Sequence, residues 1–275
     1  MNVSGRVAVV TGGASGIGRA LCHALAEAGA AAVVVADLDA AGAERVAAEI
    51  TATGHRALAA AADVADASQA QDLAGRVLGE FGRIDLLCSN AGIIARGGVE
   101  LGDDAWDRMW SVNVQGHVRL ARAVLPSMLE RGEGRLVFTA SAAGLLTQLG
   151  SAPYAVTKHA LVALAEWLSI TYGDQGIGVS CLCPQAVSTN LGETSRRQVP
   201  GATGLSPDAS PSRQAAVDGV LDPETVAASV LEGIASERFL ILPHPEVADY
   251  ERRRAGDRDR WLRGMRRLQA RLNAT

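Results

Sequence analysis

Two side chains of complementary chemistry, Tyr154 and Lys158, stand four residues apart in a segment typical of a helix. Residues with this spacing share one helix face, with Cβ atoms about 5–6 Å apart, so the phenol and the ammonium would be neighbours. A phenol titrates near pH ~10. A cation about 5 Å away, at an effective dielectric constant of about 20, would favour the phenolate by roughly 3 kcal/mol, or a little over two pKa units. We therefore expect Tyr154 to act as an acid and base.

The type of the cation is itself informative, because Lys158 is the one lysine among 26 basic residues. A lysine ammonium is a compact point charge with rotatable donors, whereas arginine presents a planar fork. A lysine in a chain so rich in arginine indicates that this position needs the ammonium. Taken alone, the pair could still be a solvated contact on a helix surface.

A glycine-rich loop lies between a β-branched run over 6–10 and a helical segment over 19–28. Gly12, Gly16 and Gly18 allow a sharp turn and a close approach to a phosphate, and the helix N-terminus supplies free N–H groups. The next predicted strand, 32–36, ends at Asp37, a position that suits hydrogen bonding to an adenosine ribose diol. Its carboxylate would repel a 2′-phosphate, and no arginine follows directly. The sequence therefore favours NAD, with NADP less favoured.

Strands and helices alternate along the rest of the chain. Further strands are predicted over 56–62, 84–88, 136–139, 179–182 and 239–242, and helices over 40–53, 68–81, 103–130, 155–172 and 223–236. The strands are apolar throughout, which indicates a parallel sheet buried on both faces. The fold class is therefore α/β, a single doubly wound domain in which ligands bind at the carboxyl ends of the strands.

Composition and net charge predict the make-up of the core, the class of protein and which partners are excluded. Hydrophobic residues make up 48% of the chain and aromatic residues 4%, which predicts a core of alanine, valine, leucine and isoleucine. The net charge of −4 indicates no nucleic-acid partner for the whole chain. Four cysteines without a CxxC spacing, no membrane-spanning apolar run and no cationic leader predict a cytoplasmic protein without a metal site.

Two segments in the C-terminal third depart from the alternation of strands and helices. Prolines, glycines and serines interrupt residues 190–222, which predicts a substrate lid with one short helix near 213–219 or, alternatively, a surface excursion. Residues 251–271 hold nine arginines against three acids and an apolar stripe, which predicts a basic amphipathic helix. We expect a dinucleotide-binding domain over 1–250 and a C-terminal helix over 251–275. The helix could pack on the body or a sister subunit, or bind an anionic surface.

Over residues 3–242 the chain resembles the short-chain dehydrogenase/reductase family. The matching motifs, in chain order, are Thr11-Gly12-x-x-x-Gly16-Ile17-Gly18, Asp63-Val64, Asn90-Ala91-Gly92, Asn113, Ser141 and Tyr154-x-x-x-Lys158. The resemblance implies a seven-stranded Rossmann sheet, a pyridine nucleotide cofactor and a homotetramer or homodimer.

The resemblance also implies roles for single residues. Tyr154 would be the acid and base, Lys158 would bind the nicotinamide ribose and lower the pKa of Tyr154, and Ser141 would hold the substrate oxygen. Asn113 would steady a water that relays protons from Lys158. The predicted cofactor contacts are Gly12, Ser15, Gly16, Ile17, Gly18, Asp37, Asp63, Val64, Asn90, Ala91, Gly92, Tyr154, Lys158, Val187 and Thr189.

One position departs from the family pattern. The family usually has Pro-Gly after the sixth strand, and here Gln185 follows Pro184. Val187 and Thr189 still match, and Gln185 could place an amide in the substrate pocket. The predicted pocket residues are Ser141, Ala143, Gln148, Tyr154 and Gln185, with apolar neighbours that suit a hydrophobic or cyclic substrate.

The predicted reaction is hydride transfer between NAD and a secondary alcohol or ketone, with Tyr154 taking the hydroxyl proton during oxidation and Ser141 donating to the oxyanion. Two alternatives stay open: a non-catalytic module that senses NAD and contacts a partner, and a carbonyl reductase that uses NADPH. The intact set of serine, tyrosine and lysine argues against the first, and Asp37 argues against the second.

Overall fold

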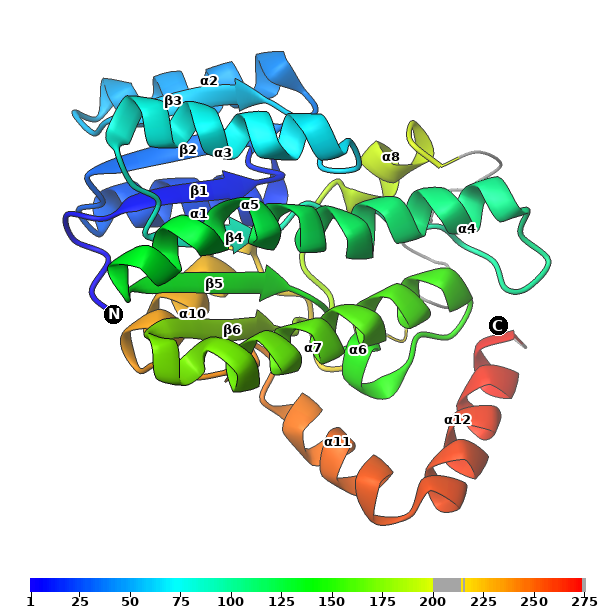
Figure 1. Cartoon of the computed structure of the whole chain (residues 1–275). Helices are drawn as coiled ribbons and strands as arrows, with labels where there is room; N and C mark the ends of the chain where they lie inside the picture. The colour runs from blue at the N-terminus through cyan, green and yellow to red at the C-terminus, as the bar shows by residue number, and fades with distance from the viewer. Residues whose placement is uncertain (200–213, 215, 274–275) are drawn as a thin grey trace.

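The computed structural model describes residues 1–199, 214 and 216–273. Within them, seven parallel strands form one sheet in the order β3-β2-β1-β4-β5-β6-β7 (Figure 1). The strands are β1 (Val7–Thr11), β2 (Ala32–Asp37), β3 (Ala57–Ala61), β4 (Leu86–Ser89), β5 (Gly134–Thr139), β6 (Ile177–Leu182) and β7 (Leu240–Ile241). This confirms the predicted α/β fold.

Helices cover both faces of the sheet (Figure 1). One face carries α1 (Gly16–Glu27), α2 (Ala40–Ala52) and α10 (Pro223–Ala235), and the other carries α3 (Ala67–Phe81), α5 (Gly116–Arg131) and α7 (Ala152–Tyr172). The shorter elements are α4 (Asp103–Trp110), the π-helical turn η1 (Ser111–Gln115), α6 (Ala143–Leu146), the 3₁₀ turn η2 (Gly173–Gln175) and α8 (Leu191–Arg196). The chain continues into α11 (Glu246–Gly256) and α12 (Arg258–Asn273).

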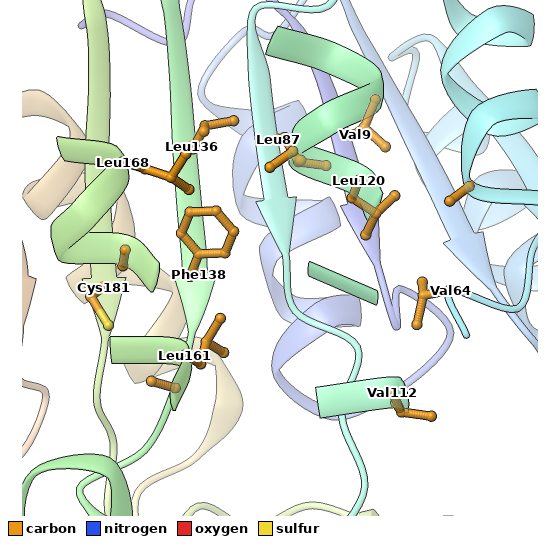
Figure 2. Packing of buried hydrophobic residues seen from close by; sticks show 14 of the residues in the cluster. Val9, Val64, Leu87, Val112, Leu120, Leu136, Phe138, Leu161, Leu168 and Cys181 are labelled. Atoms are coloured by element: carbon orange, nitrogen blue, oxygen red, sulfur yellow. The ribbon is translucent and has the colours of Figure 1, made fainter. Parts of the chain in front are cut away.

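The core divides into two clusters, one on each face of the sheet. Successive residues of β2 alternate between them: Val33 and Val35 pack with α1 and α2, whereas Val34 packs with the opposite layer. This follows from the two-residue period of a strand. Figure 2 shows part of the second cluster, where Phe138 lies among aliphatic side chains. The predicted aliphatic core is therefore confirmed.

Aspartates fix where several helices begin. Asp39 accepts from the backbone N–H of Gly42 at 3.0 Å and starts α2, and Asp66 accepts from Ser68 N at 2.8 Å and starts α3. Asp222 accepts from Thr225 N at 2.6 Å and precedes the proline that opens α10. Each carboxylate satisfies an N–H that has no partner within its helix.

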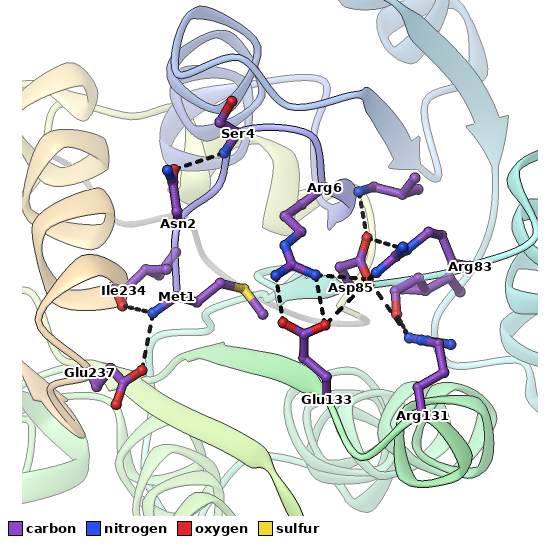
Figure 3. Close-up of polar contacts among 12 residues, drawn as sticks. Met1, Asn2, Ser4, Arg6, Arg83, Asp85, Arg131, Glu133, Ile234 and Glu237 are labelled. Atoms are coloured by element: carbon purple, nitrogen blue, oxygen red, sulfur yellow. Dashed lines mark hydrogen bonds and ion pairs between the residues drawn. The ribbon is translucent and has the colours of Figure 1, made fainter.

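An ion cluster surrounds Asp85, directly before β4 and beside the start of β1, at the amino ends of the strands (Figure 3). Asp85 is fully buried, and its carboxylate accepts from Val7 N at 2.9 Å and from Arg83 Nε at 2.8 Å. Arg6 and Arg131 each approach it to 3.9 Å. A buried carboxylate is stable only when it is paired and hydrogen-bonded, so these contacts account for the aspartate at this end of the sheet.

Two elements differ from the sequence prediction, and a third lies partly outside the described residues. The helical region over 103–130 is interrupted by η1, so Asn113 lies in a π turn between α4 and α5. The basic tail forms two helices, α11 and α12, which bend at Asp257 instead of forming one helix. Of the predicted lid, α8 is described, while residues 200–213 and 215, including part of the predicted short helix, lie outside the described residues.

Candidate active site

A cavity lies at the carboxyl edge of the sheet, and we call it the edge cavity. The residues that line it are Gly12, Ser15, Gly16, Ile17, Asp37, Leu38, Ala62, Asp63, Val64, Asn90, Ala91, Gly92, Ile93, Val112, Thr139, Ala140, Ser141, Tyr154, Lys158, Pro184, Gln185, Val187, Thr189, Leu191, Thr194 and Gln198. The glycine loop and the Tyr–Lys pair, which are far apart in sequence, therefore share one cavity.

The glycine loop is shaped by two positive φ angles and one close approach between backbone groups. Gly12 and Gly16 have φ of 65° and 51°, a conformation that disfavours residues with a Cβ. Gly18 lies beneath Gly12, and a Cβ added there would stand 1.9 Å from the Gly12 carbonyl oxygen. Asn90 supports the loop from β4, because its Nδ2 donates to Thr11 O at 3.1 Å. The loop thus passes tightly over the N-terminus of α1, where free N–H groups can hold a phosphate.

Two aspartates line the cavity near this loop. Asp37, at the end of β2, accepts from Ala14 N at 3.0 Å and from Asp39 N at 2.9 Å. Asp63, after β3, forms an ion pair with Arg108 at 3.3 Å. Arg108 also donates to Gln198 at 3.1 Å. It therefore connects Asp63, in the cavity lining, to the segment after α8. The sequence offered no signal for Arg108, because α4 and β3 meet only in the folded chain.

The Tyr–Lys pair points inward from the first turns of α7. Tyr154 is 8% exposed and Lys158 is 3% exposed, so the pair is not a solvated surface contact. Lys158 Nζ donates to Thr139 O at 2.7 Å and lies 5.6 Å from the centre of the Tyr154 ring. Ser141, also buried, forms a hydrogen bond with the Tyr154 side chain. A phenol, an ammonium and a hydroxyl thus meet at the end of β5.

Burial sets the protonation of these groups in the protein alone. It raises the pKa of Tyr154 to about 12, while the hydrogen bond with Ser141 lowers it. Burial also lowers the pKa of Lys158 to about 8. Each charged form loses its hydration, and the ammonium is directed at a carbonyl oxygen. The expected net lowering of the Tyr154 pKa is therefore wrong for the chain by itself.

Asn113 lies behind the wall of the cavity. Its side chain accepts from Ile93 N at 2.8 Å, donates to Ile93 O at 2.8 Å and donates to Thr157 Oγ1 at 3.1 Å. It therefore ties the π turn η1 to the loop after β4 and to α7. π turns often occur at functional sites, and here the turn directs a fully buried amide at both neighbours.

The remaining predicted site residues, for the cofactor or for the substrate pocket, divide into two groups. Gln185, Val187 and Thr189 line the cavity. Ala143 is buried outside its lining, and its N–H donates to Ser141 Oγ at 3.1 Å. Gln148 is also outside the lining, and so is Gly18, whose place is beneath the loop. Leu191, Thr194 and Gln198 also line the cavity, in or just after α8. They belong to the predicted substrate lid, although the sequence prediction did not name them singly.

The described residues contain no group of three histidine, cysteine or acidic residues able to hold a metal. Their four cysteines are free and buried. Among these residues, no helix is both long and apolar enough to cross a membrane.

Known proteins share both the sequence pattern and the fold. A family model described as short chain dehydrogenase matches residues 6–200. The 1-deoxy-11-beta-hydroxypentalenate dehydrogenase of Streptomyces exfoliatus is 38% identical over 251 residues, which cover 90% of this chain and 86% of that protein. Oxidoreductase UcpA of Escherichia coli K12 is 34% identical over 198 residues, or 71% of this chain and 74% of UcpA.

Solved structures extend the likeness to the whole fold. A short-chain dehydrogenase/reductase from Burkholderia phymatum in complex with NAD has a TM-score of 0.85 and 33% identity, covering 94% of this chain and 96% of that one. A Beutenbergia cavernae structure with bound NADP has a TM-score of 0.78 and 31% identity, covering 90% of this chain and all of that one. The similar proteins therefore include binders of either dinucleotide.

Proposed function

Because this chain belongs to the short-chain dehydrogenase family and is an NAD(P)-dependent oxidoreductase of CH–OH groups, we propose that it interconverts a secondary alcohol and a ketone with NAD, using Tyr154 as acid and base. One observation carries this proposal. A tight glycine loop at a helix N-terminus and a buried Tyr154–Lys158 pair line the same cavity. The proposed dinucleotide site and the proposed site of proton transfer would thus be adjacent.

The residues present fit a dinucleotide. The approach of Gly18 to Gly12 leaves no room for a Cβ, which is the close packing that a pyrophosphate loop needs. Gly12, Gly16 and the N-terminus of α1 would hold the pyrophosphate, Asp37 the adenosine ribose, and Lys158 the nicotinamide ribose. Bound NAD would supply the hydride acceptor and a positive charge next to Tyr154.

The chain's own groups would manage the proton. Tyr154 Oη would take the proton of the substrate hydroxyl as the substrate carbon gives up its hydride. Ser141 Oγ would donate to the substrate oxygen and hold it against Tyr154. The Lys158 ammonium is held in place by the hydrogen bond that its Nζ donates to Thr139 O at 2.7 Å. Burial keeps the reacting oxygen away from bulk water, which strengthens each of these contacts.

The cofactor preference rests on Asp37. Its carboxylate lines the cavity at the end of β2 and would bind a ribose diol, whereas it would repel a 2′-phosphate. The proposed substrate is a hydrophobic or cyclic alcohol, supported by Ile93, Val112 and Leu191 in the cavity wall. The hydroxypentalenate named for the Streptomyces enzyme is one candidate of this kind.

Turnover would be followed by NADH absorbance with 2-octanol, cyclohexanol, 1-indanol and 1-deoxy-11-beta-hydroxypentalenate. We expect Tyr154→Phe to lower kcat by about 10³-fold or more, because the acid/base is lost while packing is kept. NAD affinity, measured by calorimetry, should stay within about threefold of that of the parent.

Tyr172→Phe is the matched control, since Tyr172 lies at the far end of α7, and it should keep full turnover. Normal turnover by Tyr154→Phe would remove Tyr154 from its role. NAD binding without turnover in the parent chain would favour the sensing module, and a preference for NADPH would favour the carbonyl reductase.

A further inference from the structure

We propose that the C-terminal helix α11 supports the active site through Tyr250, Asp218 and Gln185, which together orient Ser141. This inference rests on the proposed function, because it assigns positioning residues to the same site. We call the chain of contacts from Tyr250 to Ser141 the Gln185 relay. Its members come from α11, the segment before α10, and the loop after β6.

At its Ser141 end, the relay consists of the peptide group between Pro184 and Gln185. The carbonyl of Pro184 accepts from Ala142 N at 2.9 Å and from Ser141 Oγ at 3.4 Å. The N–H of Gln185 belongs to the same peptide unit and donates to His244 Nδ1 at 3.2 Å. Because a peptide unit is planar and rigid, rotation of this group would shift the acceptor that faces Ser141 Oγ. The orientation of the 184–185 peptide therefore bears directly on the serine.

The side chain of Gln185 is held from the other side. Its Nε2 donates to Asp218 Oδ2 at 2.7 Å, and Tyr250 Oη donates to Asp218 Oδ1 at 2.9 Å. A carboxylate only accepts, so the amide must present its NH₂ group to Asp218, which fixes its orientation. Both oxygens of Asp218 are thus used, one toward the cavity residue and one toward α11.

Neighbouring side chains of α11 and α12 hold the ring of Tyr250 in place. Its ring packs against Trp261 of α12 at 6.4 Å between ring centres and lies beneath the Arg253 guanidinium at 5.8 Å. Both rings pack against the core cluster on the face of the sheet that carries α3, α5 and α7. Helices α11 and α12 therefore pack on the core of the domain. The Gln185 relay connects this packing to a residue that lines the edge cavity.

This arrangement explains why a glutamine can stand where the family usually has glycine. A glycine gives the backbone freedom after the sixth strand, whereas Gln185 restricts it and needs support from outside the strand. His244 supports the backbone N–H, and Asp218 supports the side chain. We infer that Gln185, Asp218 and Tyr250 act as positioning residues and touch no reacting atom.

The test exchanges the donor and the acceptor of the hydrogen bond between Gln185 and Asp218. In Gln185→Glu two carboxylates would face each other across a 2.7 Å contact, so the relay should open and kcat should fall roughly tenfold. Adding Asp218→Asn supplies an NH₂ donor to the introduced carboxylate and leaves an amide oxygen to accept from the Tyr250 hydroxyl. The double variant should therefore recover most of kcat. Tyr250→Phe should lower kcat several-fold, and Tyr172→Phe should not.

All variants would be assayed in the full chain with the most active alcohol of the panel, and NAD affinity should be unchanged throughout. If Gln185→Glu acted only by disturbing the packing, it would lower thermal stability, and adding Asp218→Asn would not restore kcat. A double variant no better than Gln185→Glu, or full kcat in Gln185→Glu and Tyr250→Phe, would overturn the relay alone. Absence of turnover in the parent chain would overturn the proposed function and the relay with it.

Discussion

At the scale of single residues, burial decides the chemistry as much as charge does. Tyr154 and Lys158 are neighbours, as the helical spacing predicts, yet both charged forms are disfavoured by burial. The cation therefore does not by itself produce a phenolate. A positive charge contributed at the nicotinamide and a substrate hydroxyl held by Ser141 would act on a phenol that is protonated in the free protein.

Asp37 offers a prediction about cofactor choice. We expect Asp37→Ala to lose the preference for NAD over NADP, measured as the ratio of kcat/KM for the two cofactors. Because Asp37 also accepts from Ala14 N at 3.0 Å, the alanine variant should bind both cofactors more weakly. Asp37→Asn is the control that keeps an acceptor for Ala14 and removes only the charge. An unchanged ratio in both variants would contradict the assignment of NAD.

His117 offers a prediction about acid stability. It is buried near Lys158, its Nδ1 lies 2.6 Å from Ser89 Oγ, and burial lowers its pKa to about 3. Above its unfolded pKa of ~6.5 the folded and unfolded chains bind equal numbers of protons here. Below it only the unfolded chain takes a proton, so stability falls by about 1.4 kcal/mol per pH unit down to pH ~3.

His117→Gln should remove this part of the slope. Urea unfolding between pH 4 and pH 7 measures it, and the variant should lose less stability with acid than the parent. His55→Gln, outside the core, serves as the matched control. Parallel curves for the parent and His117→Gln would show that His117 carries no such linkage.

At the scale of elements, the glycine loop packs on the first turn of α1 with no room for a side chain at Gly18. Gly18 fits only because it has no Cβ, since an added one would stand 1.9 Å from Gly12 O. Asn90, directly after the neighbouring strand β4, supports the loop, because its Nδ2 donates to Thr11 O. The proposed phosphate site would thus depend on two strands and one helix that meet where the strand order reverses.

Gly18→Ala should therefore weaken NAD binding by at least about tenfold, because the loop must move away from α1 to admit the methyl group. Calorimetric titration with NAD measures the effect. Gly75→Ala in α3 is the matched control, because a Cβ there meets nothing within 4 Å. It should leave binding unchanged and stabilise the fold by up to about 1 kcal/mol. Equal affinity in both variants would show that the close approach is unnecessary.

At the scale of the whole molecule, one face of α7 indicates assembly. Val156, Trp167 and Ile170 are 47%, 54% and 83% exposed on the helix that also carries the buried Tyr154 and Lys158. Apolar side chains grouped in this way mark an interaction surface more often than a solvated one. We propose that this face joins copies of the chain into a homodimer or homotetramer.

Ile170→Glu should lower the mass measured by light scattering, because a carboxylate would be buried without a partner in the interface. Val99→Glu is the matched control, since Val99 is 90% exposed on the loop that precedes α4, and it should keep the parent mass. An unchanged mass for Ile170→Glu would rule out this face as the interface.

The sequence by itself determined the order of the elements and the chemical types at the strand ends. Glycine, aspartate and apolar β-branched residues have strong local preferences, so the loop after β1, the acid after β2 and the buried strands could be predicted. The spacing of Tyr154 and Lys158 also determined that they share a helix face, because an α-helix has a fixed period.

Only the tertiary structure decided which distant groups meet and how deeply they are buried. Arg108 reaches Asp63, and Tyr250 reaches Gln185 through Asp218, across separations that no local preference encodes. The direction of the Tyr154 pKa shift likewise depends on hydration lost to neighbours from β5, β6 and α7. These outcomes come from packing the whole chain, because desolvation and long-range contacts arise only after the sheet and its helices have closed around the site.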